Sequence, residues 1–94
     1  MTTSVVNLFK EEYDIYIGRP SRYGNPFSVN PHSLAPFVVG SREEAIDSYR
    51  EYVLDRLEDD PDWLEPLRGK RLGCFCKPKA CHGDVIVELL DKEE

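Results

Sequence analysis

A strongly helical segment separates two sets of strand-forming residues in this chain. Ser41 followed by Glu44 is a capping box, and apolar residues then recur at helical spacing as far as Leu57. Strand-forming segments lie on either side of it: the β-branched and aromatic runs 5–6 and 15–17 before the helix, and the segment 71–75 after it. A helix between two strands is typical of a crossover connection, so the chain is predicted to form a small sheet covered by helices.

The remaining pattern completes a single α/β domain over residues 1–94. Asp60 and Pro61 begin a short helical turn that Gly69 ends, and a last amphipathic helix begins near His82. The segment from Ser28 to Gly40 has little pattern and is predicted to be a loop. The predicted order is β-β-loop-α-α-β-loop-α, with a sheet of about three or more strands. The first long helix should bury Ile46, Tyr49 and Val53.

The composition fits a globular protein and argues against two classes of partner. Apolar residues make up 40% of the chain, which is enough to form a core. The formal net charge is −6, with 18 acidic and 12 basic residues, so direct binding to DNA is disfavoured. No stretch approaches the ~20 apolar residues of a membrane span, and the N-terminus has no leader pattern. Three cysteines crowded between positions 74 and 81 do not resemble a secreted disulfide framework, so we expect a cytoplasmic protein, monomeric or homo-oligomeric.

Two polar loops carry the residues that are suited to chemistry. The first, Gly18 to Phe27, contains two glycines and two prolines, which exclude regular structure. It offers arginine forks for phosphate, a tyrosine ring on which a base can stack, and an asparagine amide that can pair with a base or ribose. These candidate ligand-binding residues are Arg19, Ser21, Arg22, Tyr23 and Asn25. The alternative is a purely structural loop, with Tyr23 in the core and both arginines paired with the acidic surface.

The second loop, Cys74 to Asp84, joins the last strand to the last helix. Cys81 and His82 fall at the helix N-terminus, where unpaired N–H groups and the nearby Lys77 favour an anion and raise the thiolate fraction of the cysteine. The candidate catalytic residues are therefore Cys81, His82 as a proton carrier, and Asp84 as its orienter or as a separate acid or base. The alternative is that Asp84 only stabilises the helix, the strand cysteines are core and His82 is a solvated turn residue.

Four residues of the second loop form a ligand set for tetrahedral zinc: Cys74, Cys76, Cys81 and His82. Their spacing is poor for one metal centre, because the side chains of the neighbours Cys81 and His82 are expected to diverge. We therefore predict no bound cofactor and much less than one zinc ion per chain. A zinc-stabilised protein-interaction module that uses these four ligands is the alternative function.

Five motifs in order resemble the domain-of-unknown-function family 4326, from Val5 to Leu90. The motifs are Val5-Val6-Asn7, Ile17-Gly18-Arg19-Pro20-Ser21, Tyr23-Gly24-Asn25-Pro26-Phe27, Gly73-Cys74-Phe75-Cys76-Lys77-Pro78 and Cys81-His82-Gly83-Asp84. This family is a small domain carried by phages, archaeal viruses, archaea and bacteria. The resemblance implies a viral or mobile-element setting and, for a viral protein, the host cytoplasm, but it implies no particular reaction. It puts forward Asn7, Arg19, Ser21, Asn25, Cys76, Cys81, His82 and Asp84.

The predicted organisation brings the two loops together. Ligands of open α/β sheets bind beyond the carboxyl ends of the strands, and both loops leave strands at that end. We expect a pocket between the Arg19–Asn25 loop and the Cys81–Asp84 helix start that binds a phosphorylated, nucleotide-like small molecule. Asn7 and Lys77 complete the candidate ligand-binding residues. The residue types allow either an enzyme that processes this ligand or a protein that only holds it.

Overall fold

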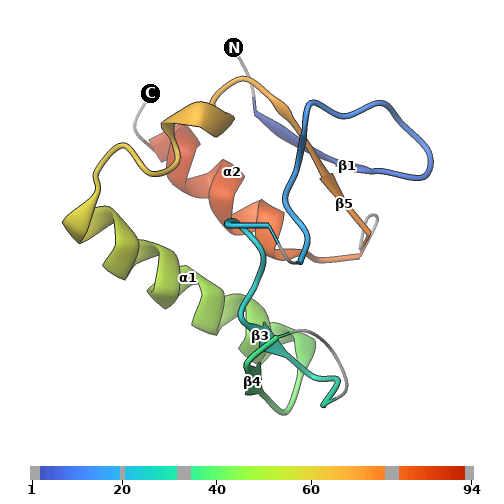
Figure 1. Ribbon diagram of the computed structural model, residues 1–94, viewed down its shortest axis with the longest axis vertical. Coiled ribbons are helices and arrows are strands. Elements are labelled where there is room, and N and C mark those ends of the chain that lie inside the picture. Colours follow the sequence, from blue (N-terminus) through green and yellow to red (C-terminus); the bar gives the residue numbers. More distant parts are fainter. Residues whose placement is uncertain (1–2, 20, 32–34, 76–78, 93–94) are drawn as a thin grey trace.

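The structure, a computed structural model, describes residues 3–19, 21–31, 35–75 and 79–92. Its main body consists of three strands and two helices (Figure 1). The strands are β1 (Ser4–Asn7), β2 (Ile15–Tyr16) and β5 (Arg71–Cys74), and the helices are α1 (Arg42–Asp59) and α2 (His82–Lys92). The other described elements are the 3₁₀ turn η1 (Glu65–Leu67) and two short strands, β3 (Phe27–Ser28) and β4 (Phe37–Val38).

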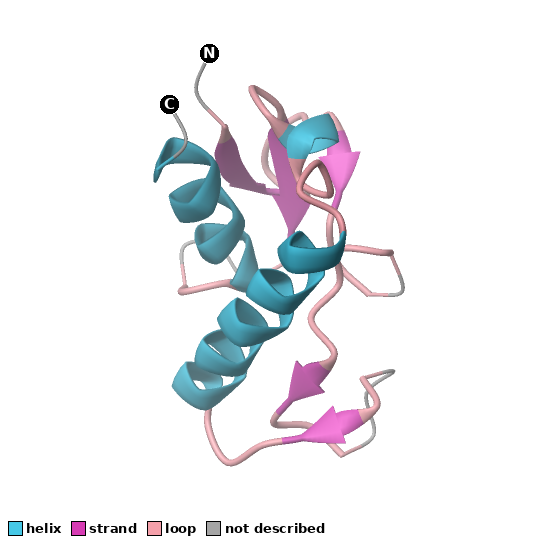
Figure 2. Cartoon of the chain, turned by 90° about the vertical axis from the view of Figure 1, so that its left-hand side faces the viewer, coloured by secondary structure: helices cyan, strands magenta, loops and turns pink. Residues whose placement is uncertain are grey.

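β1, β5 and β2 form a parallel sheet with β5 in the middle. Leu72 of β5 is fully buried and lies opposite Val5 of β1 and Ile15 of β2. Because α1 separates β2 from its parallel neighbour β5 in the chain, the predicted crossover and the α/β fold class are confirmed. Figure 2 shows both helices on the same side of this sheet. All three strands end at one edge, from which both polar loops leave.

Local sequence signals set the bounds of α1. Ser41 Oγ accepts a hydrogen bond from the N–H of Glu44 at 3.1 Å, which confirms the predicted cap. The helix ends at Asp59 rather than at Leu57. Its buried residues follow a spacing of four, namely Ala45, Tyr49 and Val53. Ile46, which was expected in the core, is only partly buried, because it lies to the side of this stripe.

After α1 the chain follows the predicted order. Trp63, Leu64 and Leu67 are buried around η1, and Gly69 ends the turn with a φ of 73°, which favours glycine. β5 and α2 begin at Arg71 and His82, as the sequence predicts. Within the described ranges, no helix combines the length and hydrophobicity needed to cross a membrane.

The segment that was predicted to be a loop contains two short parallel strands. β3 pairs with β4 through Phe27 opposite Phe37 and Ser28 opposite Val38, and the two phenylalanine rings stack with centroids 5.3 Å apart. Strands of two residues are too short to show an alternating pattern, so the sequence does not reveal them. Residues 32–34, between these strands, lie outside the described part of the chain.

Asp14, which precedes β2, forms hydrogen bonds with Arg71 of β5, and these bonds should make the free energy of unfolding depend on pH. Hydrogen bonds from the guanidinium and the backbone N–H of Arg71 lower the pKa of Asp14 to about 2. A lowered pKa stabilises the fold above the ordinary carboxyl pKa of about 3.9, and this stabilisation is lost as pH falls toward 2. Urea midpoints of wild type and Asp14→Asn should therefore differ at pH 6 and converge between pH 4 and 2.

Glu12 is the matched control for this measurement. Its carboxylate lies 3.9 Å from the Arg71 guanidinium, but its side chain is 93% exposed. Exposed ion pairs contribute little to stability, so Glu12→Gln should keep the wild-type midpoint at every pH. A gap between wild type and Asp14→Asn that stays constant down to pH 2 would contradict the role given to Asp14.

Candidate functional site

The two polar loops meet at the carboxyl edge of the sheet, as predicted. β2 leads into Ile17 and Arg19, and β5 ends at Cys74. α2 begins at the same edge, where the Nε2 atom of His82 lies 2.8 Å from the carbonyl oxygen of Ile17. This buried hydrogen bond ties the start of the last helix to the start of the first loop.

A pocket of about 150 Å³ lies between the two loops and the first turn of α1. Its polar lining comes from Arg19 and Asn25 of the first loop, Ser28 of β3, Cys81 and His82 at the start of α2, and Arg42 at the start of α1. A second pocket, of about 200 Å³, is also lined by Arg19 and Asn25. The first loop therefore contributes the same two side chains to both pockets.

Two arginines give the first pocket a positive lining in an acidic protein. Among the described residues, Arg19 forms no ion pair with a carboxylate. Arg42 Nη1 donates to the carbonyl oxygen of Ala80 at 3.1 Å and so links α1 to the second loop. The N-termini of α1 and α2 add the positive ends of their dipoles at the same place. The acidic first-turn residues of α1, Glu43 and Glu44, line a different surface hollow.

Arg42 was not among the site residues predicted from the sequence. A cation in the first turn of a helix is unfavourable to the helix dipole, and acidic residues are usual at that position. Arg42 stands directly after the N-cap residue Ser41, so this unusual position for a cation could have been recognised from the sequence. Only the structure shows that its side chain reaches the second loop.

Ser21 and Asn25 lie in the first loop but have different surroundings. Ser21 lines the second pocket, and its buried hydroxyl has no hydrogen-bond partner among the described residues. Asn25 is buried, its Nδ2 donates to the carbonyl oxygen of Ala45 at 3.1 Å, and its Oδ1 accepts from the N–H of Phe27 at 2.9 Å. Asn25 therefore holds the loop against α1 and retains one amide hydrogen and one lone pair for a ligand.

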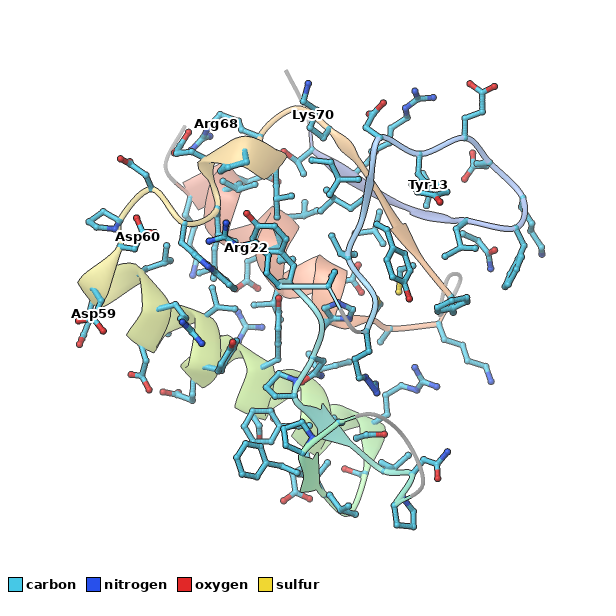
Figure 3. The ribbon with its side chains drawn as sticks, viewed as in Figure 1. Tyr13, Arg22, Asp59, Asp60, Arg68 and Lys70 are labelled. Carbon is cyan, nitrogen blue, oxygen red and sulfur yellow. The ribbon has the colours of Figure 1, made fainter. Side chains whose placement is uncertain are left out.

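Three predicted ligand-binding residues lie outside both pockets. Tyr23 is buried, its ring packs on Trp63, and burial raises its pKa, so the core alternative is correct for this side chain. Arg22, which is labelled in Figure 3, lies over the rings of Tyr23 and Trp63 and lines neither pocket. Asn7 Oδ1 accepts from the N–H of Phe9 and closes the turn that follows β1. Lys77 lies outside the described residues.

The start of α2 combines a structural role with reactive side chains. Asp84 accepts a hydrogen bond from the N–H of Cys81 at 3.1 Å, while Cys81 Sγ accepts from the N–H of Gly83 at 3.4 Å. Asp84 thus stabilises the helix start, as the structural alternative supposed. His82 is buried with its ring edge against Tyr49, so the alternative of a solvated turn residue is wrong.

Cys74, Cys81 and His82 form a group that could hold a metal ion. All three are buried, and their ligand atoms lie within 4.8 Å of one another. The prediction that the side chains of Cys81 and His82 diverge is wrong, because Cys81 Sγ and His82 Nδ1 are 3.5 Å apart. Cys81 precedes the first helical residue, so its backbone does not follow the helical rotation that separates neighbours. Cys76, the fourth predicted ligand, lies outside the described residues.

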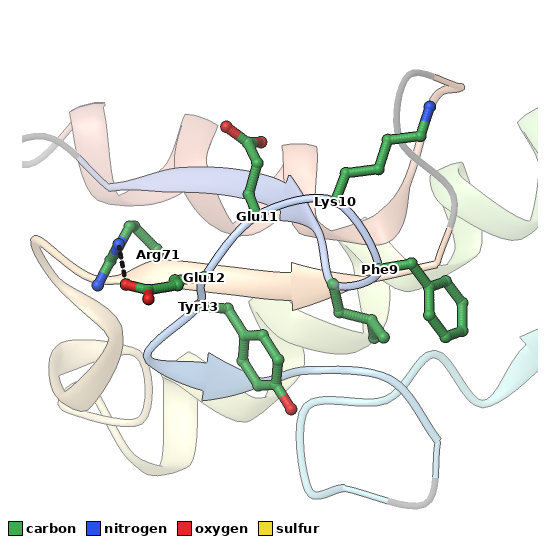
Figure 4. Close-up of a pocket in the computed structure, with 7 residues that line it drawn as sticks. Phe9, Lys10, Glu11, Glu12, Tyr13 and Arg71 are labelled. Atoms are coloured by element: carbon green, nitrogen blue, oxygen red, sulfur yellow. Dashed lines mark ion pairs between the residues drawn. The ribbon is translucent and has the colours of Figure 1, made fainter.

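A larger hollow, of about 550 Å³, lies on another part of the surface (Figure 4). It is formed by residues 8–13 and Arg71, whose guanidinium pairs with Glu12 and Asp14. The Arg71 guanidinium is therefore already paired, and none of Cys74, Cys81 and His82 lines this hollow. The smaller pocket between the loops is the better candidate.

Comparison with known proteins identifies the family of this chain. The family model described as Domain of unknown function (DUF4326) matches residues 4–92. The chain belongs to this family. It is also 40% identical over 91 residues to the uncharacterized 12.4 kDa protein in the nrdA-td intergenic region of Enterobacteria phage T4. The alignment covers 94% of this chain and 77% of the phage protein. No solved structure is significantly similar to this chain.

The family assignment confirms the resemblance and gives the site a context. A phage relative fits the viral or mobile-element setting that the motifs implied. In this DUF4326 domain, the described motif residues Arg19, Ser21, Asn25, Cys81 and His82 line one or the other of two pockets that share a wall. Asn7 and Asp84 instead hydrogen-bond to backbone N–H groups nearby.

Proposed function

We propose that the domain binds a phosphorylated, nucleotide-like small molecule in the pocket between the first loop and the start of α2. The observation that carries this proposal is the pair of arginines, Arg19 and Arg42, that line one pocket together with the N-termini of both helices. Guanidinium groups and helix N-termini are the usual protein groups that bind phosphate. In a chain with a net charge of −6, they provide a local exception to the acidic surface.

The sizes of the two pockets suit the parts of such a ligand. A pocket of about 150 Å³ is smaller than the roughly 300 Å³ at the lower end for drug-sized ligands, so it fits a phosphate group better than a whole nucleotide. The neighbouring pocket of about 200 Å³ offers space for a sugar or base. Ser21 supports this assignment, because its buried hydroxyl would gain a hydrogen-bond partner from a ligand there.

Replacing Arg19 with alanine should weaken ligand binding more than tenfold. A charge-assisted hydrogen bond to phosphate contributes roughly 1.5 to 3 kcal/mol. The measurement is a thermal-shift screen of wild type with nucleoside diphosphates, ADP-ribose-like compounds and cyclic nucleotides, followed by titration of each variant. A ligand at a hundred times its dissociation constant adds about 2.7 kcal/mol of stability, which moves the melting temperature by roughly 10 to 20 °C in a domain of this size.

Arg22→Ala is the matched control for this experiment. It removes the same charge from the same loop, but Arg22 lies over Tyr23 and Trp63, outside both pockets. Its affinity for the ligand should stay close to that of wild type. An equal loss in both variants, or a screen in which no phosphorylated compound shifts wild type, would contradict the proposed pocket.

Whether the ligand is processed is a separate measurement. Cys81 and His82 are the pocket residues that can act as nucleophile or base. An enzyme would return an altered compound after incubation, detected by mass spectrometry, and Cys81→Ser would leave the compound unchanged. A binding protein would return the compound intact.

A second candidate function is a zinc-stabilised interaction module, which the convergence of Cys74, Cys81 and His82 favours. In such a module the metal holds the fold together and makes no contact with a small ligand. Chelation should then unfold the domain, while the nucleotide screen should give no shift.

A further inference from the structure

The group formed by Cys74, Cys81 and His82 carries an inference that concerns the floor of the pocket. The three side chains come from two elements that meet at the edge of the sheet, since Cys74 ends β5 and the other two begin α2. All are buried, with Cys74 and Cys81 each 2% exposed. Two thiols and an imidazole within 4.8 Å are a donor set that Zn²⁺ prefers.

The histidine ring is oriented as a metal ligand would be. Its Nε2 lies 2.8 Å from the carbonyl oxygen of Ile17, and a carbonyl can only accept, so Nε2 carries the proton. In the neutral ring this leaves the lone pair on Nδ1, the atom that faces Cys81 Sγ. Histidines that bind metals usually donate their other N–H to a backbone carbonyl or a carboxylate in this way.

The distance between these two atoms fits tetrahedral coordination. With Zn–S near 2.3 Å and Zn–N near 2.0 Å, a tetrahedral centre separates its sulfur and nitrogen ligands by about 3.5 Å. Cys81 Sγ and His82 Nδ1 are 3.5 Å apart. The thiol of Cys74 lies within 4.8 Å of both atoms, so small side-chain rotations are sufficient to complete three ligands.

We propose that Cys74, Cys81 and His82 hold a Zn²⁺ ion whose fourth coordination position opens into the ligand pocket. Cys81 and His82 both line this pocket, whereas Cys74 does not. The described part of the chain supplies three ligands to this group. Zinc sites with three protein ligands and one open position bind a substrate or water, while structural sites have four protein ligands. A phosphate oxygen of the ligand would occupy this fourth position. That part of the inference rests on the proposed function, whereas the metal site itself does not.

Substitution of Co²⁺ into the full chain tests the ligand set. One Co²⁺ per chain should bind, with thiolate charge-transfer bands and the strong d–d bands of tetrahedral coordination. Cys74→Ser, Cys81→Ser and His82→Gln should each weaken metal binding more than about 100-fold, beyond the 10- to 100-fold effect of outer-sphere changes. His82→Gln keeps a side-chain N–H that can reach Ile17, so its circular dichroism spectrum should remain that of a folded protein.

Cys76→Ser distinguishes an open site from a closed one. If the fourth position is open to the pocket, this variant should keep the metal and its spectrum. Adding imidazole or inorganic phosphate to the Co²⁺ protein should then change the d–d bands, and Arg19→Ala should weaken the phosphate effect alone.

Two results would overturn the inference: a protein that binds no stoichiometric Co²⁺ or Zn²⁺, or a Cys76→Ser variant that releases the metal. Bands that imidazole changes and phosphate does not would support the open metal site and count against the proposed ligand. A nucleotide that binds at wild-type affinity to a metal-free protein would support the pocket and contradict a phosphate oxygen at the fourth coordination position.

Discussion

Replacing Tyr49 with alanine should remove about 3 to 5 kcal/mol from the free energy of unfolding, the usual range when a large buried aromatic side chain is truncated. The Tyr49 side chain is 0% exposed, and its hydroxyl donates to the carbonyl oxygen of Tyr23 at 2.7 Å. Its ring also meets the ring of His82 edge-on, with centroids 5.0 Å apart. Because a domain of this size has only about 5 to 15 kcal/mol of stability, the urea midpoint should fall steeply.

Two further variants separate the causes of this loss. Leu54→Ala changes a side chain on the same helix that is 40% exposed, so its effect should be near 0.5 kcal/mol. Tyr49→Phe removes only the hydroxyl, which burial keeps protonated by raising the pKa of Tyr49, and should cost about 1 to 3 kcal/mol. Equal urea midpoints for Tyr49→Ala and Leu54→Ala would show that Tyr49 does not support the core.

The parts of the fold that sequence could predict depend on local signals. Ser41 and Glu44 mark the start of α1 through one hydrogen bond between residues three positions apart in the chain. The strand-forming runs before and after that helix are enough to predict a crossover, because a parallel neighbour must be reached across one face of the sheet. That topology in turn places both polar loops at one edge, and so the meeting of Asn25 and His82 in one pocket followed from the sequence.

The parts that sequence could not predict depend on contacts between distant residues. Arg42 enters the pocket because its guanidinium reaches Ala80, 38 positions away in the chain. Tyr23 was equally suitable for a ligand or for the core, and its hydrogen bond to Trp63, 40 positions away, decides for the core. Cys81 and His82 converge only because α2 begins at His82 and not one residue earlier. Sequence patterns locate helix ends only within a few residues, so they could not predict this convergence.

Replacing Asn25 with alanine should destabilise the domain by about 1 to 3 kcal/mol and also weaken ligand binding, because this side chain shapes the pocket that it lines. Asn25 is 6% exposed, and both ends of its amide hydrogen-bond to backbone groups, at Ala45 and Phe27. An exposed loop side chain would change stability by less than about 0.5 kcal/mol. Urea denaturation of Asn25→Ala beside Arg19→Ala should therefore show a loss of stability in the first variant only.

Asn25→Asp tests the same contacts through pH. The substitution keeps the acceptor for the N–H of Phe27 but points an oxygen instead of a donor at the carbonyl of Ala45. Burial should raise the pKa of the new carboxyl above its ordinary value of about 3.9, because the ionised form loses solvation there. A raised carboxyl pKa destabilises the fold at neutral pH and ceases to do so as the group becomes protonated, when it can donate to Ala45 again. The difference in urea midpoint between this variant and wild type should therefore be large at pH 7 and shrink toward pH 4. A difference that does not vary with pH would mean that the Asn25 amide does not hold the loop to α1.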